Sequence, residues 1–355
     1  MKIIFIGPEI SIHIQKWVDA FKNDNEVYLI TMHPVNDNSW SFNNTIVLKF
    51  KNAFGYYLNA LDVHRIVKDI KPDVVNVHYA SGYGTLARFS RIGGYILNVW
   101  GSDVFDFPYE SKIKMKIIKK NLIAAEQIAS TSEVMKIQTE KQIKPKKEII
   151  VTPFGVDTNV FCPKTKQDSG KIIIGTVKTL SPKYGIDILI KAYNETYIKG
   201  LTNSELWIVG GGSQESELKT LANSLPSGQN IKFVGFVKHD AVPGYLTEFD
   251  IYVALSESES ESFGVAVVEA ESCGVPVIVS NVGGLPEVVK NEETGFIVQH
   301  GDYVAAAEKI LFLSKDNSLR ERMGNNARNF VCSKYSWDVC VDIMINMFRS
   351  FVKPI

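Results

Sequence analysis

The chain has 355 residues, more than one hydrophobic core usually serves, and its 45% apolar and 22% charged residues are typical of folded globular domains. Its 39 Lys and Arg residues balance 39 Asp and Glu residues, which argues against a dedicated nucleic-acid-binding protein. Four scattered cysteines favour a reducing compartment, and no apolar run reaches the roughly 18 residues that would span a membrane. We therefore expect a cytoplasmic protein that is at most peripheral on the inner face of the membrane.

The first half of the chain alternates short apolar runs with amphipathic segments. The run at 2–6 predicts a buried strand, and residues 11–22 after it have the apolar spacing of a helix. Further apolar runs at 26–31, 72–78 and 95–100 suit parallel strands that are buried on both faces.

The second half repeats this pattern after a break. Residues 162–170 are polar, contain Pro and Gly and lack periodicity, so we expect a linker there. A strand at 171–177 then begins a new series of strands and helices, and the chain ends in a predicted helix at 336–352. This alternation predicts an α/β protein with a doubly wound parallel sheet in each half.

One loop carries the strongest chemical signal, because open parallel sheets bind ligands at the carboxyl ends of their strands. In residues 255–289, Glu261 and Glu269 lie on either side of Gly264, where a helix is expected to begin. A helix start offers free N–H groups to a diphosphate, and a glycine there allows close approach. Carboxylates beside it can accept hydrogen bonds from sugar or ribose hydroxyls. A single Glu would be an ordinary surface residue, but the full run favours a binding site.

The run ESFGVAVVEA, followed by CGVPVIVS and GGLPE, resembles the donor-site motif of the family 4 retaining glycosyltransferases, which have the GT-B fold. The resemblance covers nearly all of 150–340 and extends more thinly into the N-terminal half. Further matching segments occur in the same order at 151–161, 206–219, 233–256 and 294–298.

The resemblance implies two Rossmann-like doubly wound parallel-sheet domains that face a central cleft. Residues 1–164 would bind the acceptor, residues 165–335 would bind the nucleotide-sugar, and residues 336–355 would form a helix that crosses back to the first domain. The implied activity is retaining transfer from a nucleotide-sugar, UDP-linked by preference and GDP-linked next, to a glycan or lipid-linked acceptor. The pathway would be cell-surface polysaccharide or glycolipid biosynthesis.

The resemblance also implies roles on the donor side. Glu269 would hold the ribose hydroxyls, and Glu261 would contact hydroxyls of the transferred sugar. Lys178, where the family has an Arg, and Lys183 would bind the diphosphate; a Lys keeps the charge but loses the bidentate fork. Two cations there would stabilise the charge that develops on the leaving group. The other donor-binding residues implied are Gly7, Gly210, Phe236, Val237, Phe263, Gly264 and Val265.

On the acceptor side, residues 100–107 resemble a loop of the family that lies close to the reacting sugar. Asp103, with Ser102 beside it, would orient or deprotonate the acceptor hydroxyl. The alternative that Asp103 only caps a helix stays open. His13 and His78 are further candidates for acceptor binding, although either could instead pack or face solvent.

The sequence contains no D-x-D, H-x-x-x-H or C-x-x-C motif, so we expect no metal requirement. Gly7 is followed by Pro8 and Glu9, which breaks the glycine pattern of nicotinamide-binding loops, so the nucleotide-sugar is the expected co-substrate and no cofactor is expected. Retention without an evident nucleophile suggests front-face attack, in which the departing phosphate accepts the proton.

Two other functions remain open at this point. A nucleotide-sugar epimerase of similar shape would bind the same donor without an acceptor, and a catalytically silent partner subunit would bind it without turnover. Lys178 in place of Arg and the reduced first loop keep the silent binder open, whereas the intact Glu261 and Glu269 argue against it.

The charge is unevenly distributed along the chain. Residues 1–160 hold 20 basic and 16 acidic side chains, and much of this surplus lies at 112–120 and 136–147. These stretches allow the N-terminal domain to contact an anionic membrane, although such runs are more often solvated helix faces.

Overall fold

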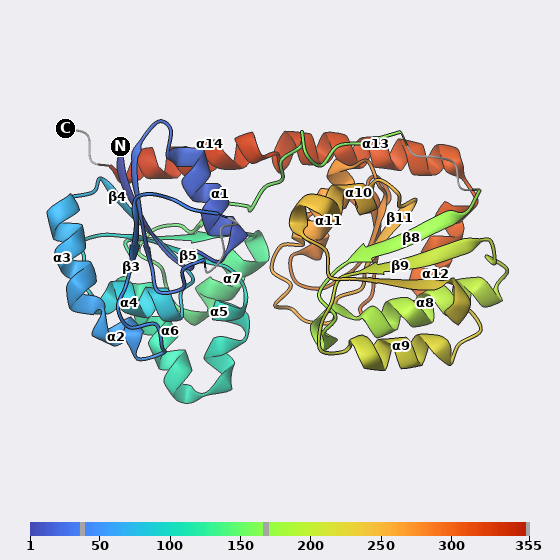
Figure 1. Ribbon diagram of the computed structural model, residues 1–355, viewed down its shortest axis with the longest axis horizontal. Coiled ribbons are helices and arrows are strands. Elements are labelled where there is room, and N and C mark those ends of the chain that lie inside the picture. Colours follow the sequence, from blue (N-terminus) through green and yellow to red (C-terminus); the bar gives the residue numbers. More distant parts are fainter. Residues whose placement is uncertain (36–39, 166–169, 353–355) are drawn as a thin grey trace. The chain divides into compact units, whose positions relative to one another are not determined.

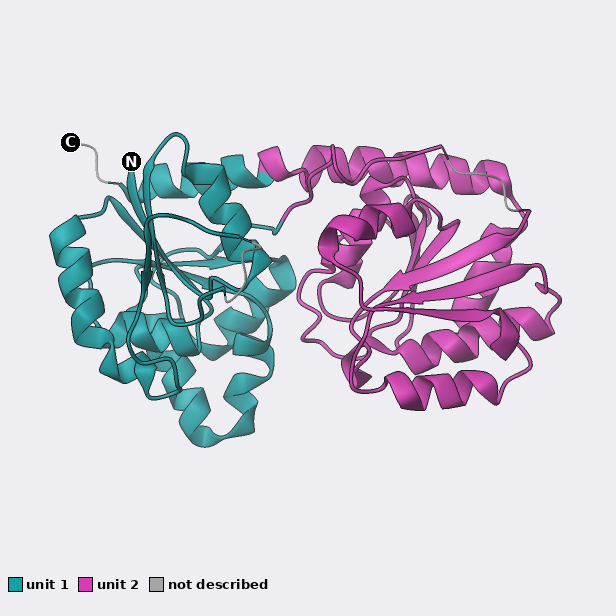
Figure 2. Cartoon of the chain, viewed as in Figure 1, with its two compact units in different colours: residues 1–154, 340–355 teal, residues 155–339 magenta. Residues whose placement is uncertain are grey.

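The computed structural model describes residues 1–35, 40–165 and 170–352 (Figure 1). The chain divides into two compact units, coloured separately in Figure 2. Unit 1 comprises Met1–Phe154 with Cys340–Ile355, and unit 2 comprises Gly155–Val339.

Unit 1 is built on a seven-stranded parallel sheet in the order β3-β2-β1-β4-β5-β6-β7. Its strands are β1 (Lys2–Ile6), β2 (Glu26–Thr31), β3 (Thr45–Val47), β4 (Val74–His78), β5 (Ile96–Val99), β6 (Gln127–Ser130) and β7 (Ile150–Val151). Every residue of β4, β5 and β6 is buried, and β4 and β5 accordingly read as mostly apolar runs. The edge strand β3 was not predicted, because it has three residues and none is buried.

Two helices of unit 1, α6 (Lys112–Ala124) and α7 (Glu133–Gln142), have serine caps: the side chains of Ser111 and Ser132 accept backbone N–H bonds in their first turns. The helix α14 (Trp337–Phe351) begins in unit 2 and continues into unit 1. There Phe348 is buried with its ring 5.1 Å from that of Phe21. The other helices are α1 (Ile12–Phe21), α2 (Gly55–Leu58), α3 (Ala60–Ile70), α4 (Gly82–Phe89) and α5 (Ser102–Phe105).

Unit 2 is built on a six-stranded parallel sheet in the order β10-β9-β8-β11-β12-β13. Helix α8 packs against α12, and α11 packs against α13. The strands are β8 (Ile172–Val177), β9 (Ser204–Val209), β10 (Ile231–Gly235), β11 (Ile251–Ala254), β12 (Val277–Ser280) and β13 (Gly295–Val298). The helices are α8 (Ile186–Ile198), α9 (Glu215–Asn223), α10 (Val242–Leu246), α11 (Val265–Ser272), α12 (Tyr303–Ser314) and α13 (Asn317–Lys334).

Both units have the doubly wound arrangement that the sequence predicts. In each sheet the strand order reverses between its first strand and its fourth, which are neighbours: β1 and β4 in unit 1, β8 and β11 in unit 2. Ligands bind outside the carboxyl ends of the strands at such a switch point. The loops after these four strands are therefore the places where each unit can hold a ligand.

The unit boundary falls between Phe154 and Gly155, before the expected boundary at 164/165. The reason is that the segment after Gly155 is anchored on unit 2. Phe161 is 1% exposed, and its carbonyl oxygen accepts hydrogen bonds from Arg328 at 2.7 Å and from Ser272 Oγ at 2.6 Å. Part of the expected linker at 162–170, residues 166–169, lies outside the described residues.

Candidate functional site

Loops from neighbouring strands of unit 2 meet at the carboxyl edge of its sheet. Backbone hydrogen bonds tie them together: Leu180 N–H donates to Gly211 at 3.0 Å, and Glu257 N–H donates to Lys183 at 2.9 Å. Gly284 N–H donates to the carbonyl of Glu261 at 2.8 Å. Residues that are far apart in the sequence thereby form one surface at the switch point.

Two glycines allow this close approach. Gly210 has φ 141°, and a Cβ there would lie 1.9 Å from the carbonyl oxygen of Lys178. Gly264, with φ 89°, is the N-cap of α11, and a Cβ there would lie 2.8 Å from Leu285. Both positions require glycine for the backbone geometry that the loops need.

The surface holds a buried ion pair. Lys178 Nζ lies 2.9 Å from Glu261 Oε2, and the two side chains are 9% and 10% exposed. Ser256 Oγ donates a further hydrogen bond to the same carboxylate oxygen at 3.4 Å. The pair joins the loop after β8 to the loop after β11, so the structure brings together two residues that the sequence singled out.

Lys183 is the second cation at this surface. It belongs to the short 3-10 helix Pro182–Tyr184, and its Nζ donates to the carbonyl of Ser260 at 2.7 Å. The ammonium groups of Lys178 and Lys183 lie 4.8 and 5.4 Å from the ring centre of Tyr184. Burial, together with the charge of Glu261, raises the pKa of Tyr184. Both predicted lysines therefore converge on one aromatic ring.

The start of α11 completes the surface. Within the described part of the chain, the backbone N–H groups of Gly264, Val265 and Ala266 donate no hydrogen bond. Unpaired amides at a helix start, beside two lysines, form an anion-binding arrangement. The ring of Phe263 is buried against Tyr335 at 5.4 Å, so only its backbone is available for a ligand.

Glu269 lies in the second turn of the same helix and is 3% exposed. Its Oε1 is 2.8 Å from Nε2 of His239, a residue that the sequence analysis did not identify. His239 begins the 3-10 helix His239–Ala241 after β10, and its side chain is 38% exposed. Phe236 and Val237 lie in the same loop, and Phe236 is 81% exposed. This loop is thereby linked to α11 through a His–Glu contact.

In unit 1, the predicted residues at the switch point are mostly buried. Gly7 is buried, and a Cβ there would lie 2.7 Å from Ile14. His13 stacks on Phe154 with the ring centres 3.8 Å apart. His78 is 1% exposed; its Nε2 lies 3.0 Å from Asn76 Nδ2, and its Nδ1 has no hydrogen-bond partner. Burial, and then the neighbouring His13, lowers the pKa of His78 to about 3, so its ring is neutral.

Asp103 is fully buried and acts on its own loop. Its carboxylate accepts hydrogen bonds from the N–H groups of Ala80 at 2.8 Å, Trp100 at 3.0 Å and Gly101 at 2.9 Å. Burial raises its pKa, and these backbone bonds oppose the rise. Asp103 lies in the first turn of α5, whose N-cap is Gly101, so it does not cap the helix as the alternative expected. Its contacts instead give it a structural role, in which it holds the backbone of its own loop and of the loop after β4. Ser102 beside it is half-buried, and its Oγ lies 2.6 Å from Tyr79 Oη.

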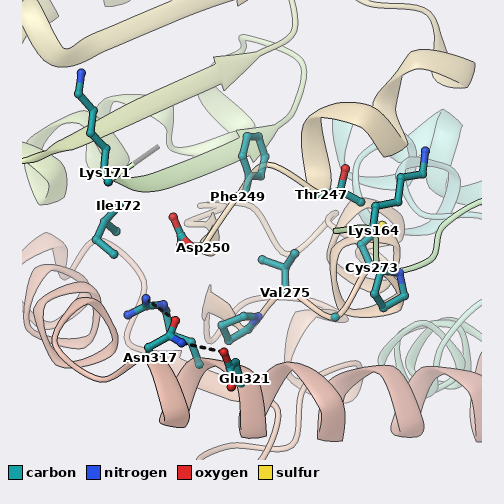
Figure 3. Close-up of a pocket in the computed structure, with 15 residues that line it drawn as sticks. Lys164, Lys171, Ile172, Thr247, Phe249, Asp250, Cys273, Val275, Asn317 and Glu321 are labelled. Atoms are coloured by element: carbon teal, nitrogen blue, oxygen red, sulfur yellow. Dashed lines mark hydrogen bonds between the residues drawn. The ribbon is translucent and has the colours of Figure 1, made fainter. Parts of the chain in front are cut away.

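Unit 2 also has a hollow of about 770 Å³ at the opposite edge of the sheet (Figure 3). Lys171, Asp250 and Val275, which line it, precede β8, β11 and β12. Several of its polar groups are already paired: Asp250 accepts the N–H of Ile173, and Asn317 donates to Glu321. The hollow therefore lies away from the predicted donor-site residues, which are at the carboxyl edge of the sheet.

Among the described residues, no three His, Cys, Asp or Glu side chains are grouped so that they could hold a metal ion. Nor does the described part of the chain contain a helix of the length and apolar character that a membrane span needs.

Two family models match the chain. Residues 158–330 match the model of glycosyl transferases group 1, and residues 2–132 match the glycosyl transferase 4-like model. Together they cover most of both units, and the first contains every predicted donor-site residue except Gly7.

Several characterised proteins are similar in sequence. The chain is 32% identical over 247 residues to the capsular polysaccharide biosynthesis glycosyltransferase CapM of Staphylococcus aureus, an alignment that covers 65% of this chain and 63% of that protein. It is 27% identical to the N-acetyl-alpha-D-glucosaminyl L-malate synthase of Bacillus anthracis, over 74% of this chain and 71% of that one. The chain thus spans slightly less than two thirds of the first relative.

Solved structures share the fold over the whole chain. Sucrose-phosphate synthase from Thermosynechococcus elongatus superposes with a TM-score of 0.83 at 20% identity, covering 98% of each chain. The Anabaena protein HepE, solved in complex with UDP, superposes with a TM-score of 0.80 at 17% identity over 99% of each chain. These likenesses confirm the α/β fold with two Rossmann-like units that was expected.

Proposed function

Since the chain belongs to the family 4-like glycosyltransferases of the GT-B fold, we propose that it transfers a sugar from a nucleotide-sugar to a glycan or lipid-linked acceptor with retention of configuration. The proposed donor is UDP-linked, and the proposed pathway is cell-surface polysaccharide or glycolipid biosynthesis. The name of the capsular polysaccharide relative supports the pathway, and the UDP complex of HepE supports the nucleotide.

The observation that carries the proposal is the group of charges beside the start of α11. Lys178 and Lys183 converge on Tyr184, next to the unpaired amides of Gly264 and Val265. In the proposed complex, the diphosphate binds these amides and both ammonium groups. The lysines then neutralise the negative charge that grows on the diphosphate as the sugar leaves, which is the task that a metal ion performs in other transferases.

The carboxylates have separate tasks in this proposal. Glu269 accepts hydrogen bonds from the ribose hydroxyls, and Glu261 accepts them from the sugar. Because Lys178 is already paired with Glu261, the arriving diphosphate takes over part of the lysine's charge. The exchange frees one lone pair of Glu261 for a sugar hydroxyl, which couples diphosphate binding to sugar binding.

The proposed reaction is a front-face substitution. The acceptor oxygen bonds to the anomeric carbon on the face from which the diphosphate leaves, the bond to the diphosphate oxygen breaks, and the acceptor proton passes to the diphosphate. No side chain has to act as a strong base. The backbone bonds that occupy Asp103 agree with this scheme, because they leave that carboxylate unsuited to proton abstraction.

Thermal-shift titration against UDP-, GDP- and ADP-sugars, with EDTA present, tests the proposal. We expect a rise in melting temperature with the UDP-sugars that is lost in Glu269→Ala and retained in the control Glu308→Ala, an exposed glutamate on α12. The absence of any shift in a folded protein would overturn the proposal. Slow hydrolysis of the bound donor separates a transferase from a silent binder, and conversion to an epimeric sugar without an acceptor would identify an epimerase.

A further inference from the structure

Helix α6 presents an unusual outer face. Its inner face buries Ile118, Asn121 and Leu122. Along one stripe of the helix, four lysines and two isoleucines are exposed and no acidic residue occurs. Of the two isoleucines, Ile113 is 71% exposed and Ile123 is 55% exposed. This outer face, which we call the α6 stripe, consists of Lys112, Ile113, Lys116, Lys119, Lys120 and Ile123.

The lysines of the α6 stripe have no ion-pair partner among the described residues, whereas Lys114, beside the stripe, pairs with Glu110. The other basic stretch, 136–147, differs. There Lys136 pairs with Glu148 at 2.9 Å, and Lys146 and Lys147 pair with Glu126 at 3.6 and 3.2 Å. The structure therefore distinguishes two stretches that look alike in the sequence, and only the first leaves a continuous positive face.

Exposed apolar side chains lie on the neighbouring helices. Phe54, Leu58 and Leu61, around α2 and α3, are 73%, 54% and 59% exposed. Tyr57 and Phe89 are 42% and 44% exposed, and their rings meet edge to face at 4.9 Å. We call these five residues the aromatic cluster. Large apolar side chains gathered in this way on a surface usually mark an interaction site.

Helix α4 connects the aromatic cluster to helix α6, which carries the α6 stripe. The guanidinium of Arg88 lies over the ring of Phe89 at 4.3 Å, and its Nε donates to Asn121 of α6 at 2.8 Å. Helices α2, α4 and α6 pack in sequence and lie beside one another in Figure 1. The α6 stripe and the aromatic cluster therefore lie on helices that pack against one another in unit 1.

We propose that the α6 stripe and the aromatic cluster bind the surface of an anionic lipid bilayer. Lysine stems extend along apolar surface while their ammonium groups reach the headgroups, and isoleucine and aromatic side chains enter the boundary with the acyl chains. A polyanion such as nucleic acid would satisfy the lysines but would leave Ile113, Ile123 and Phe54 exposed to water. This inference does not depend on the donor site.

Flotation with vesicles of phosphatidylglycerol and phosphatidylcholine at low salt tests the charge requirement. We expect binding that is lost with pure phosphatidylcholine and at high salt. Each lysine near an anionic bilayer strengthens binding about fivefold, so Lys112→Gln/Lys116→Gln/Lys119→Gln is expected to weaken it about 100-fold. The matched triple Lys136→Gln/Lys146→Gln/Lys147→Gln removes the same net charge and is expected to change binding by only a few-fold.

The apolar part is tested separately. Ile113→Ser/Ile123→Ser is expected to weaken binding about tenfold, because partial burial of two isoleucines is lost, whereas Ile198→Ser, at an exposed position on α8, leaves it unchanged. An unchanged melting temperature shows that each variant is folded. No vesicle binding, an equal loss in both lysine triples, or binding to duplex DNA in preference to vesicles would each overturn the proposal.

Discussion

The two units share one topology, yet their switch points are built differently. At the switch point of unit 2, two lysines converge on Tyr184, one of them pairs with Glu261, and the amides at the start of α11 are unpaired among the described residues. At the switch point of unit 1, Asp103 is bound by three backbone amides, and Asn76 is bonded to both Asn98 and His78. Polar groups whose hydrogen bonds are already made by neighbouring groups keep the loops in their conformation. Charged groups that converge can instead exchange one of their partners for a ligand. This difference is the reason why we propose that the anion binds to unit 2.

The largest expected effect concerns the buried ion pair of unit 2. Lys178→Met leaves the Glu261 carboxylate buried without its cation, so the free energy of unfolding is expected to fall by about 3–5 kcal/mol. Urea unfolding measures this loss. Adding Glu261→Gln should recover a large part of it, and the control Lys171→Met, which breaks an exposed pair with Glu205, should cost at most about 1 kcal/mol. An equal loss in the free energy of unfolding for both single variants would show that the buried pair stabilises the protein no more than the exposed one.

A second test asks whether the charges act on the reaction. Lys183→Ala is expected to lower kcat by about 100- to 1000-fold, because one preorganised charge on the leaving diphosphate is removed. The exposed Lys191→Ala is the control, since its ammonium pairs with Asp187 on the surface of α8. Steady-state kinetics with the donor found by thermal shift provides the measurement. A rise in KM alone would mean that Lys183 binds the ground state and transition state equally.

The third test concerns unit 1 and the buried His78. Its folded pKa of about 3 lies below the usual value of 6.5, so between these values the unfolded chain binds a proton that the folded chain does not. Stability is therefore full above about pH 6.5 and falls as the pH drops toward 3. Between pH 7 and 4.5, wild type should lose about 2–3 kcal/mol more than His78→Phe, as measured by urea unfolding at both values.

His64→Gln, which changes an exposed histidine of α3, should keep the wild-type pH dependence. If His78→Phe also kept it, the ring of His78 would have to be charged or open to water in the folded protein, and the contrast between the units would be weaker than stated.

The sequence predicts the alternation of strands and helices well, because buried parallel strands are continuous apolar runs. It misses β3, whose three residues carry no such signal, and the compact units of the structure meet at Phe154 and Gly155, before the predicted domain boundary. The observed boundary depends on Arg328, which bonds to Phe161 across 167 positions. Local patterns carry no trace of such a contact.

In the candidate site, too, some features could be predicted from the sequence and others could not. Glu261, Gly264 and Glu269 stand in one contiguous run, so a resemblance can find them. The pairing of Lys178 with Glu261 spans 83 positions and follows only from the strand order. His239 lies 30 positions before Glu269, inside the matching segment 233–256, but the resemblance gives it no role of its own.

His239 gives the smallest expected effect and the sharpest test of the donor site. Its ring holds Glu269 Oε1 at 2.8 Å, so it fixes the carboxylate where the ribose is proposed to bind. The His239→Gln variant keeps a hydrogen-bond donor, but at the end of a more flexible side chain. We expect it to raise KM for the nucleotide-sugar about three- to tenfold with little change in kcat, because about one hydrogen bond is lost. His300→Gln, beside Glu257, is the matched control and should leave KM unchanged. A change in kcat with an unaltered KM would place His239 nearer to the reacting atoms than to the ribose.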